Sequence, residues 1–289
     1  MTPTPATRAA HPGEPAGPAG PAIACTGLAY RFGATLAVDG VDFDVAPGEV
    51  FGLLGPNGAG KTTTIRAITT LLPVPSGMVR VFGHDVRRER MRVRRLLGYV
   101  PQQLSADAAL NGRENVMLFA RVYDVPRRER AARVDRALAA VGLTDAAHRL
   151  AATYSGGMVR RLELAQALVS APRLLILDEP TIGLDPIART SVWQRLAEVR
   201  HATGMTVLVT THAMEEADRY CDRVALMHLG RIRALGTPAE LKAGLATATG
   251  LVRPTLEDVF RHHAGGSLDD EGGEFRDVRS TRRTASRLG

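Results

Sequence analysis

From Ile23 onward the chain alternates between short apolar runs and longer amphipathic stretches. Four apolar runs predict buried strands: Val50–Gly55, Leu174–Asp178, Met205–Thr210 and Arg223–His228. Turn residues or charges bound each run, as is typical of strands that are buried on both faces. Because helical patterns separate these runs, the sequence predicts an α/β fold built on a parallel sheet.

The pattern changes between Pro101 and Tyr154, where strand signals vanish and helical periodicity takes over. Helices are predicted over Arg113–Tyr123 and Arg128–Val141. We therefore expect an inserted α-helical subdomain over about residues 101–165 of a domain spanning residues 23–241.

Both ends of the chain have a different composition. Residues 1–22 are rich in Pro, Ala, Gly and Thr, and are expected to form a disordered leader. After Leu241 the chain becomes polar and rich in Gly, Asp and Arg, and only Leu251–Phe260 retains a pattern. Residues 242–289 are therefore predicted to be a short C-terminal extension whose last part is disordered.

The bulk composition is that of a globular protein. Hydrophobic residues make up 45% of the 289 positions and charged residues 23%. No apolar run approaches the roughly 18 residues that a membrane span needs, so we expect a cytosolic chain that cannot itself form a pore. Cys25 and Cys221 fit no metal-ligand spacing and are expected to be reduced thiols in the core.

The net charge of +7 has two local sources, Arg87–Arg95 and Arg276–Arg287. The first predicts an exposed amphipathic helix with Val86, Met91 and Leu96 on its buried side. Anionic lipid headgroups and nucleic acid are alternative partners for such a basic stretch. Because the remaining basic residues are scattered, we expect no nucleic-acid partner.

One glycine-rich segment fits the phosphate-binding pattern G-x-x-x-x-G-K-[ST], and a predicted strand precedes it while a predicted helix, Lys61–Leu71, follows. Glycines let successive backbone N–H groups point at a phosphate, and the helix N-terminus adds partial positive charge. These features predict an ATP site with Mg²⁺, in which Lys61 reaches the β- and γ-phosphates and the Thr62 hydroxyl binds the metal. The nucleotide-binding set is Gly55, Pro56, Asn57, Gly58, Ala59, Gly60, Lys61, Thr62 and Thr63.

Lysine at position 61 is itself informative. Of the 37 basic residues only Lys61 and Lys242 are lysines. A chain that uses arginine almost everywhere keeps lysine where a compact point charge is needed and a planar fork is not.

Two acids and a histidine follow other predicted strands. Asp178 and Glu179 end the strand that begins at Leu174, and His212 follows the strand that begins at Met205. At the carboxyl edge of a parallel sheet, Asp178 suits Mg²⁺ and Glu179 suits general-base activation of water. His212 is predicted to contact the γ-phosphate, although a histidine at a strand end is more often structural.

The segment Tyr154-Ser155-Gly156-Gly157-Met158 resembles the LSGGQ signature of ABC ATPases, and Arg160–Val169 resembles the helix that follows it. The resemblance runs from Ile23 to Leu241 and implies a P-loop NTPase core of the ABC type, with ATP and Mg²⁺ as cofactors. It further implies that Gln102 acts as the Q-loop residue, binding Mg²⁺ and sensing the γ-phosphate. By the same resemblance Asp185, in the D-loop, touches the opposing subunit.

Two details of the nucleotide site also depend on this resemblance. The family places an aromatic ring against adenine near Arg31–Gly33, which here is Phe32, with Tyr30 as a rival. Ser155, Gly156 and Gly157 would form a second anion site at a helix start. Because the chain has one copy of each element, the expected arrangement is a head-to-tail homodimer or a pair with another ATPase subunit. Each ATP would then lie between the phosphate loop of one subunit and the signature of the other.

A narrower resemblance links Tyr154–Leu164 (YSGGMVRRLEL) and Pro254–Phe260 (PTLEDVF) to the daunorubicin/doxorubicin-resistance ATP-binding subunits. It implies export of a hydrophobic drug-like compound or lipid through a separate membrane-spanning permease, with this chain peripheral on the cytoplasmic face of the cell membrane. The Pro254 segment equally fits an ordinary amphipathic helix that buries Leu256, Val259 and Phe260.

Two other functions are weighed against export. An importer ATPase of the maltose type would carry a sizeable regulatory domain after the core, whereas fewer than 50 residues follow Leu241. A soluble ABC ATPase acting on ribosomes usually carries two cassettes. A soluble ABC ATPase acting on DNA usually has a far longer separation between the phosphate loop and the acid pair, or carries zinc-binding cysteines. In this chain Lys61 and Asp178 are 117 positions apart.

Overall fold

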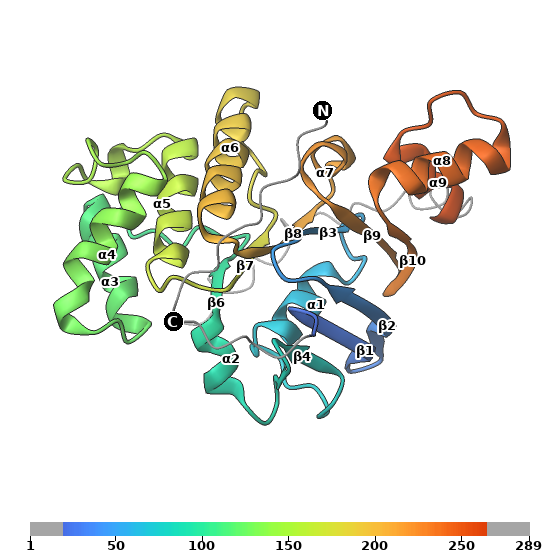
Figure 1. Ribbon diagram of the computed structural model, residues 1–289, viewed down its shortest axis with the longest axis horizontal. Coiled ribbons are helices and arrows are strands. Elements are labelled where there is room, and N and C mark those ends of the chain that lie inside the picture. The colour runs from blue at the N-terminus through green and yellow to red at the C-terminus, as the bar shows by residue number, and fades with distance from the viewer. Residues whose placement is uncertain (1–19, 265–289) are drawn as a thin grey trace, which may run out of the picture.

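The computed structural model describes residues 20–264, which form two sheets surrounded by helices (Figure 1). The larger sheet has the strand order β10-β9-β3-β8-β7-β6, and the smaller has the order β2-β1-β4-β5. The strands are β1 (Ile23–Phe32), β2 (Thr35–Val45), β3 (Val50–Leu54), β4 (Val79–Val81), β5 (His84–Asp85), β6 (Leu97–Val100), β7 (Leu174–Asp178), β8 (Thr206–Thr211), β9 (Arg223–His228) and β10 (Arg231–Gly236). The helices are α1 (Lys61–Ile68), α2 (Arg90–Leu96), α3 (Gly112–Val122), α4 (Arg127–Ala140), α5 (Gly156–Leu168), α6 (Pro186–Thr203), α7 (Met214–Tyr220), α8 (Pro238–Thr249) and α9 (Leu256–Ala264), with one 3₁₀ turn, Ala151–Thr153.

The larger sheet is parallel from β6 through β9, and only β10 runs antiparallel to its neighbour. Alternate residues of a central strand enter two different apolar clusters. Leu175 and Leu177 pack with the helices α4, α5 and α6, whereas Leu174 and Ile176 pack with α1 and the smaller sheet. A strand buried on both faces must be apolar throughout, which is why β7 appears in the sequence as an unbroken apolar run.

The predicted α/β fold is confirmed, including all four strands named from the sequence. β7 and β9 lie where they were predicted, β3 ends one residue earlier than expected, at Leu54, and β8 is shifted by one residue, to Thr206–Thr211. The smaller sheet was not predicted as a separate antiparallel unit. Its strands β1 and β2 are irregularly paired, with register shifts that blur the period-two pattern.

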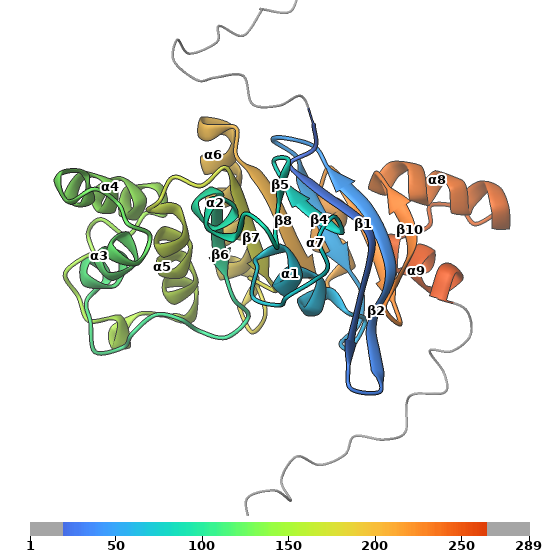
Figure 2. The same cartoon turned by 90° about the horizontal axis from the view of Figure 1, so that it is seen from below.

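Helices α3, α4 and α5 form a group of their own between β6 and β7, at the left of Figure 1. The two helices predicted in this region correspond to α3 and α4, each beginning one residue earlier than expected. Asn111 opens α3 with a reciprocal capping box to Glu114. In both views this helical group lies beside the sheet and away from β1 and β2 (Figures 1 and 2).

One sequence prediction about a surface segment needs correction. Met91 is 58% exposed and does not lie on the buried side of α2, because the helix begins only at Arg90 and turns Val93 inward. The other two residues of that prediction, Val86 and Leu96, are buried and half-buried. The arginine-rich stretch Arg276–Arg287 lies outside the described residues.

The boundaries assigned to the two ends also shift. Ala22, which was assigned to the leader, is fully buried and its N–H bonds to the Val45 carbonyl. At the other end, α8 crosses the expected boundary after Leu241. Its signals are a capping box between Thr237 and Glu240 and a left-handed Gly250 at its end, whereas its apolar pattern is weak. The expected disorder of the leader and of the tail falls on residues outside the described range.

The remaining sequence predictions about burial hold. Leu256, Val259 and Phe260 of α9 are buried against the core, and so are both cysteines.

Within residues 20–264, none of the helices combines the length and the apolar character that crossing a bilayer requires.

Candidate nucleotide-binding and hydrolysis site

The phosphate loop connects β3 to α1 at the carboxyl edge of the larger sheet. Gly55 and Gly60 have φ of 156° and 104°, and both approach other backbone closely. A Cβ on Gly55 would overlap the Met227 carbonyl oxygen, and one on Gly60 would lie 2.5 Å from the Ala37 oxygen. Glycine is therefore required at both positions by conformation and by space.

Helix α1 begins at this loop with an uncapped N-terminus. Gly60 is its N-cap residue, no side chain caps the helix, and its first turn carries no acid. The positive end of the helix dipole therefore has no neutralising side chain on α1 itself, which favours an anion at this place.

Lys61 is 5% exposed and curls over the loop. Its Nζ donates to the carbonyl oxygens of Gly55 at 2.7 Å and Pro56 at 3.1 Å, and lies 3.2 Å from a Glu179 carboxylate oxygen. The Lys61 ammonium thus lies between the phosphate loop and Glu179, which directly follows β7.

Asp178 meets two hydroxyl groups at this edge. Thr210 donates to Asp178 Oδ1 at 2.6 Å, and the Thr62 hydroxyl is 3.4 Å from the same oxygen. Burial raises the pKa of the Asp178 carboxyl above its ordinary value, and the hydrogen bonds from the threonines oppose that rise. The structure therefore brings together two of the three residues predicted to hold Mg²⁺, Asp178 and Thr62, and not the third, Gln102.

Glu179 is held by its backbone and by its side chain. Its φ is 50°, an uncommon value for a residue with a side chain, and its N–H donates both to the Thr210 carbonyl at 3.1 Å and to the Thr210 hydroxyl at 3.0 Å. Its Oε2 lies 2.9 Å from His212 Nδ1. A strained backbone fixed by several contacts is typical of a functional position.

Sequence reasoning missed Thr210. Its hydroxyl accepts from the Glu179 N–H and donates to Asp178, so one side chain fixes both acids. The available signal was its place two residues before His212, on a strand that pairs with β7 with Asp178 opposite Thr210. Threonine is common in strands, so the residue type alone indicated nothing.

The structure places two other predicted site residues apart from the acids. Gln102 is exposed, and among residues 20–264 none hydrogen-bonds to its side chain. Ser155 is also exposed and caps α5 by accepting from the Met158 N–H at 3.3 Å. In both views α5 lies with the helical group and α1 lies with the sheets, so the phosphate loop and Ser155 belong to separate parts of one chain (Figures 1 and 2).

The signature segment packs against the start of α6. A Cβ on Gly157 would lie 2.8 Å from the Ala188 Cβ, and one on Gly156 would lie 3.6 Å from Leu184. Asp185 caps α6 by accepting from the Ile187 and Ala188 N–H groups. The predicted signature and D-loop are thus neighbours on one exposed surface.

Thr63, the last residue of the predicted nucleotide-binding segment, lies half-buried on the first turn of α1.

Phe32 stands at the end of β1, 46% exposed, with the Tyr30 ring edge-on at a centroid distance of 4.9 Å. The hairpin that carries it continues to Ala37, whose carbonyl oxygen approaches Gly60. The two aromatic candidates therefore share one hairpin that borders the phosphate loop.

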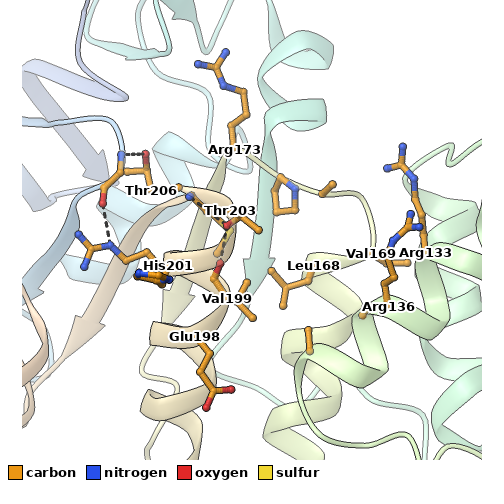
Figure 3. Close-up of a pocket in the computed structure, with 18 of the residues that line it drawn as sticks. Arg133, Arg136, Leu168, Val169, Arg173, Glu198, Val199, His201, Thr203 and Thr206 are labelled. Atoms are coloured by element: carbon orange, nitrogen blue, oxygen red, sulfur yellow. Dashed lines mark hydrogen bonds between the residues drawn. The ribbon is translucent and has the colours of Figure 1, made fainter. Parts of the chain in front are cut away.

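A separate cavity lies at the opposite edge of the sheet, lined by residues just before β7 and β8 and by α4, α5 and α6 (Figure 3). In Figure 3, Arg173 lies at the top of the view, whereas Arg133 and Arg136 lie at the right, so their guanidinium groups do not converge. Arg133 is already paired with Glu129. Ligands of parallel sheets bind at the carboxyl edge, and we assign this amino-edge cavity no role.

Comparison with known proteins identifies the family. The profile of the ABC transporter family matches residues 38–182. The daunorubicin/doxorubicin resistance ATP-binding protein DrrA of Streptomyces peucetius is 48% identical over 241 residues, which are 82% of this chain and 71% of that protein. The Nod factor export ATP-binding protein I of Paraburkholderia xenovorans is 44% identical over 212 residues, 73% of this chain and 69% of that protein.

Solved structures agree with this result. An ATP-binding subunit of an ABC transporter matches with a TM-score of 0.72 and 29% identity, covering 84% of this chain and 99% of that one. The dimeric ATP-binding cassette MJ0796, in a post-hydrolysis state with ADP and Pi, matches with a TM-score of 0.66 and 26% identity over 74% of this chain and 98% of that one. The chain therefore belongs to the ABC transporter family, as one of its ATP-binding and ATP-hydrolysing subunits.

Proposed function

We propose that this chain hydrolyses MgATP at the edge defined by the phosphate loop, Asp178 and Glu179, and thereby powers export through a separate membrane subunit. The observation that carries the proposal is the convergence of Lys61, Thr62, Asp178, Glu179 and His212 at one edge of the sheet.

The donors at this edge fit Mg²⁺. The metal prefers oxygen ligands, and usually takes one or two carboxylates together with substrate phosphates and water. Thr62 and Asp178 supply a hydroxyl and a carboxylate around one point, and Gln102 would add an amide oxygen. When bound, the ion neutralises charge that develops on the phosphates.

Hydrolysis then depends on how the chain places a water molecule. Glu179 accepts one proton of the water while the water oxygen forms a bond to the γ-phosphorus. The bond from that phosphorus to the bridging oxygen then breaks, and ADP leaves with that oxygen. Lys61 stabilises the phosphate charge, and His212 holds the Glu179 carboxylate in place and lies ready to contact the γ-phosphate.

The second half of each site would come from another subunit. Ser155 is exposed and Gly157 is half-buried at the start of α5, a helix that lies apart from α1 in Figure 1. A head-to-tail dimer would bring the signature of one chain onto the ATP of the other, and MJ0796 is an ABC cassette described as a dimer. Phe32, or Tyr30 beside it, would stack on adenine from the hairpin that borders the loop.

Export through a membrane partner is supported by the relatives and by the surface. The relatives' names describe resistance to daunorubicin and export of Nod factor, so a hydrophobic drug-like compound or lipid is the proposed class of substrate. The segment after Gln102 and helix α3 expose the apolar side chains Leu104, Leu118 and Val122. These form the proposed contact with the permease, and they would hold the chain at the cytoplasmic face of the membrane.

The test uses inside-out vesicles from cells that express the chain with a candidate permease, a neighbouring gene product with several apolar spans. We expect ATP-dependent accumulation of daunorubicin or a fluorescent lipid, and its loss in Glu179→Gln. The matched control is Glu198→Gln, because Glu198 is an exposed acid on α6 whose ion partner is Arg195. Accumulation that persists in Glu179→Gln would contradict the proposal.

A further inference from the structure

Helix α5 contains a buried ion pair that the hydrolysis site does not use. Arg160 and Glu163 are 5% and 1% exposed, and Arg160 Nη1 lies 2.8 Å from Glu163 Oε2. Burying two charges is costly unless hydrogen bonds satisfy their remaining donors and acceptors. The partners that satisfy this pair therefore indicate what the pair holds.

Those partners all lie on the segment that carries Gln102. Arg160 donates to the main-chain oxygens of Gln102 at 2.8 Å and Pro101 at 3.2 Å. Glu163 accepts from the N–H of Ser105, and from its hydroxyl at 3.2 Å. Both charged side chains thus bind the backbone of residues 101–105 to α5, and none of these contacts depends on the side chains of Pro101 or Gln102.

The contacts continue to helix α3. The Ser105 hydroxyl also lies 3.3 Å from Gln166 Oε1, which can accept its one proton in place of Glu163, and the Gln166 amide donates to Asn115 at 3.2 Å. Asn115 accepts from the Asp107 N–H at 2.8 Å. The loop after Gln102 is therefore joined to the helical group at several successive residues, from Pro101 to Asp107.

The same helix begins at the signature. Arg160 lies five residues after Ser155, or about 7.5 Å along the helix axis. A displacement of the Gln102 backbone would be passed through Arg160 to the end of α5 that presents Ser155. The neighbouring Arg161 makes its hydrogen bonds elsewhere. Its guanidinium donates to the Val141 and Gly142 carbonyl oxygens inside the helical group, and not to the Gln102 segment.

We propose that Arg160 and Glu163 are positioning residues that clamp the Gln102 segment to α5, so that γ-phosphate contact at Gln102 sets the position of Ser155. This proposal rests on the roles proposed above for Gln102 and Ser155. The clamp makes the sensor of one nucleotide and the signature that serves the partner's nucleotide parts of a single rigid body, which couples the two sites of a dimer.

The test variant is Arg160→Met together with Glu163→Met in the full chain. Exchange of a whole buried ion pair for apolar residues of similar volume is often neutral for stability, whereas loss of one partner is strongly destabilising. The matched control is Arg161→Met, which removes an arginine from the same helix and spares the Gln102 segment. Thermal unfolding establishes that both variants are folded.

Three measurements are compared: ATPase turnover, MgATP affinity, and the distance between spin labels at Leu150→Cys and Leu71→Cys. The distance is measured with and without ATP in a Glu179→Gln background. Leu150 and Leu71 are exposed, and the two native cysteines are buried and so protected from labelling. The double variant should keep MgATP affinity, lose roughly 10- to 100-fold in turnover and lose the ATP-induced distance change. Arg161→Met should match the parent chain.

The remaining outcomes separate the clamp from the function on which it rests. If Gln102→Ala leaves turnover and the distance change intact, the proposed sensing role of Gln102 is wrong and the clamp has nothing to transmit. If Gln102→Ala abolishes both while the double variant retains both, the clamp alone is refuted. A double variant that loses MgATP affinity in proportion to turnover also refutes it, because the effect would then arise at the phosphate loop.

Discussion

His212 Nδ1 lies 2.9 Å from Glu179 Oε2, and these two residues follow neighbouring parallel strands of the larger sheet. The other Glu179 oxygen lies 3.2 Å from Lys61 Nζ. The carboxylate is therefore held from both sides, while its backbone is fixed by Thr210. This arrangement leaves Glu179 few other conformations, which is what a base that must meet a water molecule requires.

Replacement of Glu179 by Gln should separate hydrolysis from binding. Gln keeps the shape of the side chain but cannot accept a proton from water, so turnover should fall by roughly 10²- to 10⁴-fold. ATP should then hold two chains together, and gel filtration with ATP should show a dimer. Turnover close to that of the parent chain would show that another group is the base.

Thr210→Val should damage catalysis through the two acids. Val has nearly the shape of Thr but neither accepts from the Glu179 N–H nor donates to Asp178, so we expect turnover to fall roughly 10-fold and stability by about 1–3 kcal/mol. Thr206→Val is the matched control, because Thr206 is buried on the same strand and its hydroxyl accepts from the Gly48 N–H at the opposite edge. Urea unfolding and ATPase assays on both variants check the prediction. Equal losses of turnover would contradict it.

Asp178→Asn should make the nucleotide-free chain more stable than the parent chain, and this advantage should grow as pH rises. The folded-state pKa of Asp178 is raised by burial, so between its unfolded and folded pKa values the folded chain binds more protons than the unfolded chain. Stability is therefore lost as pH rises through that window, and Asn does not suffer this loss. The Tm of the variant minus that of the parent should be larger at about pH 7 than at about pH 4. The same variant should lose Mg²⁺-dependent turnover. A Tm difference that does not change with pH would show that burial of the charge has no net cost.

Local signals made much of the fold and part of the site predictable. Leu174–Asp178 was identifiable because a strand buried on both faces needs unbroken apolar residues, and Gly55 and Gly60 because only glycine fits their backbone. Met91 was misplaced because periodicity cannot show where a short helix begins. Thr210 was missed because its importance arises from pairing with a strand 32 positions away.

The buried pair on α5 was also beyond sequence reasoning. Arg160 and Glu163 lie in a helix that also carries Arg161, and charged residues three apart usually indicate an exposed face. Only the fold shows that the segment after β6 covers this face, 58 and 59 positions earlier in the chain. Contacts between distant segments of this kind leave no periodic trace in one sequence.

The two-chain site can be tested by mixing inactive variants. Lys61→Ala should disable the phosphate loop of its own chain, whereas Ser155→Ala should disable the ATP of the partner. In a mixed dimer of these two variants, a head-to-tail arrangement places both lesions in one site and leaves the other intact. A site built from one chain would instead carry one lesion in each copy.

Mixing the two purified variants should therefore restore a fraction of ATPase activity that neither variant shows alone. A crosslink between Ser155→Cys and Gly58→Cys checks the geometry, because it should join two chains and never form within one. Gly58 tolerates the probe sterically, since a Cβ there meets no atom within 4 Å, although its φ of 82° favours glycine. Crosslinks confined to single chains would overturn the head-to-tail dimer, because they would place the signature over the phosphate loop of its own subunit.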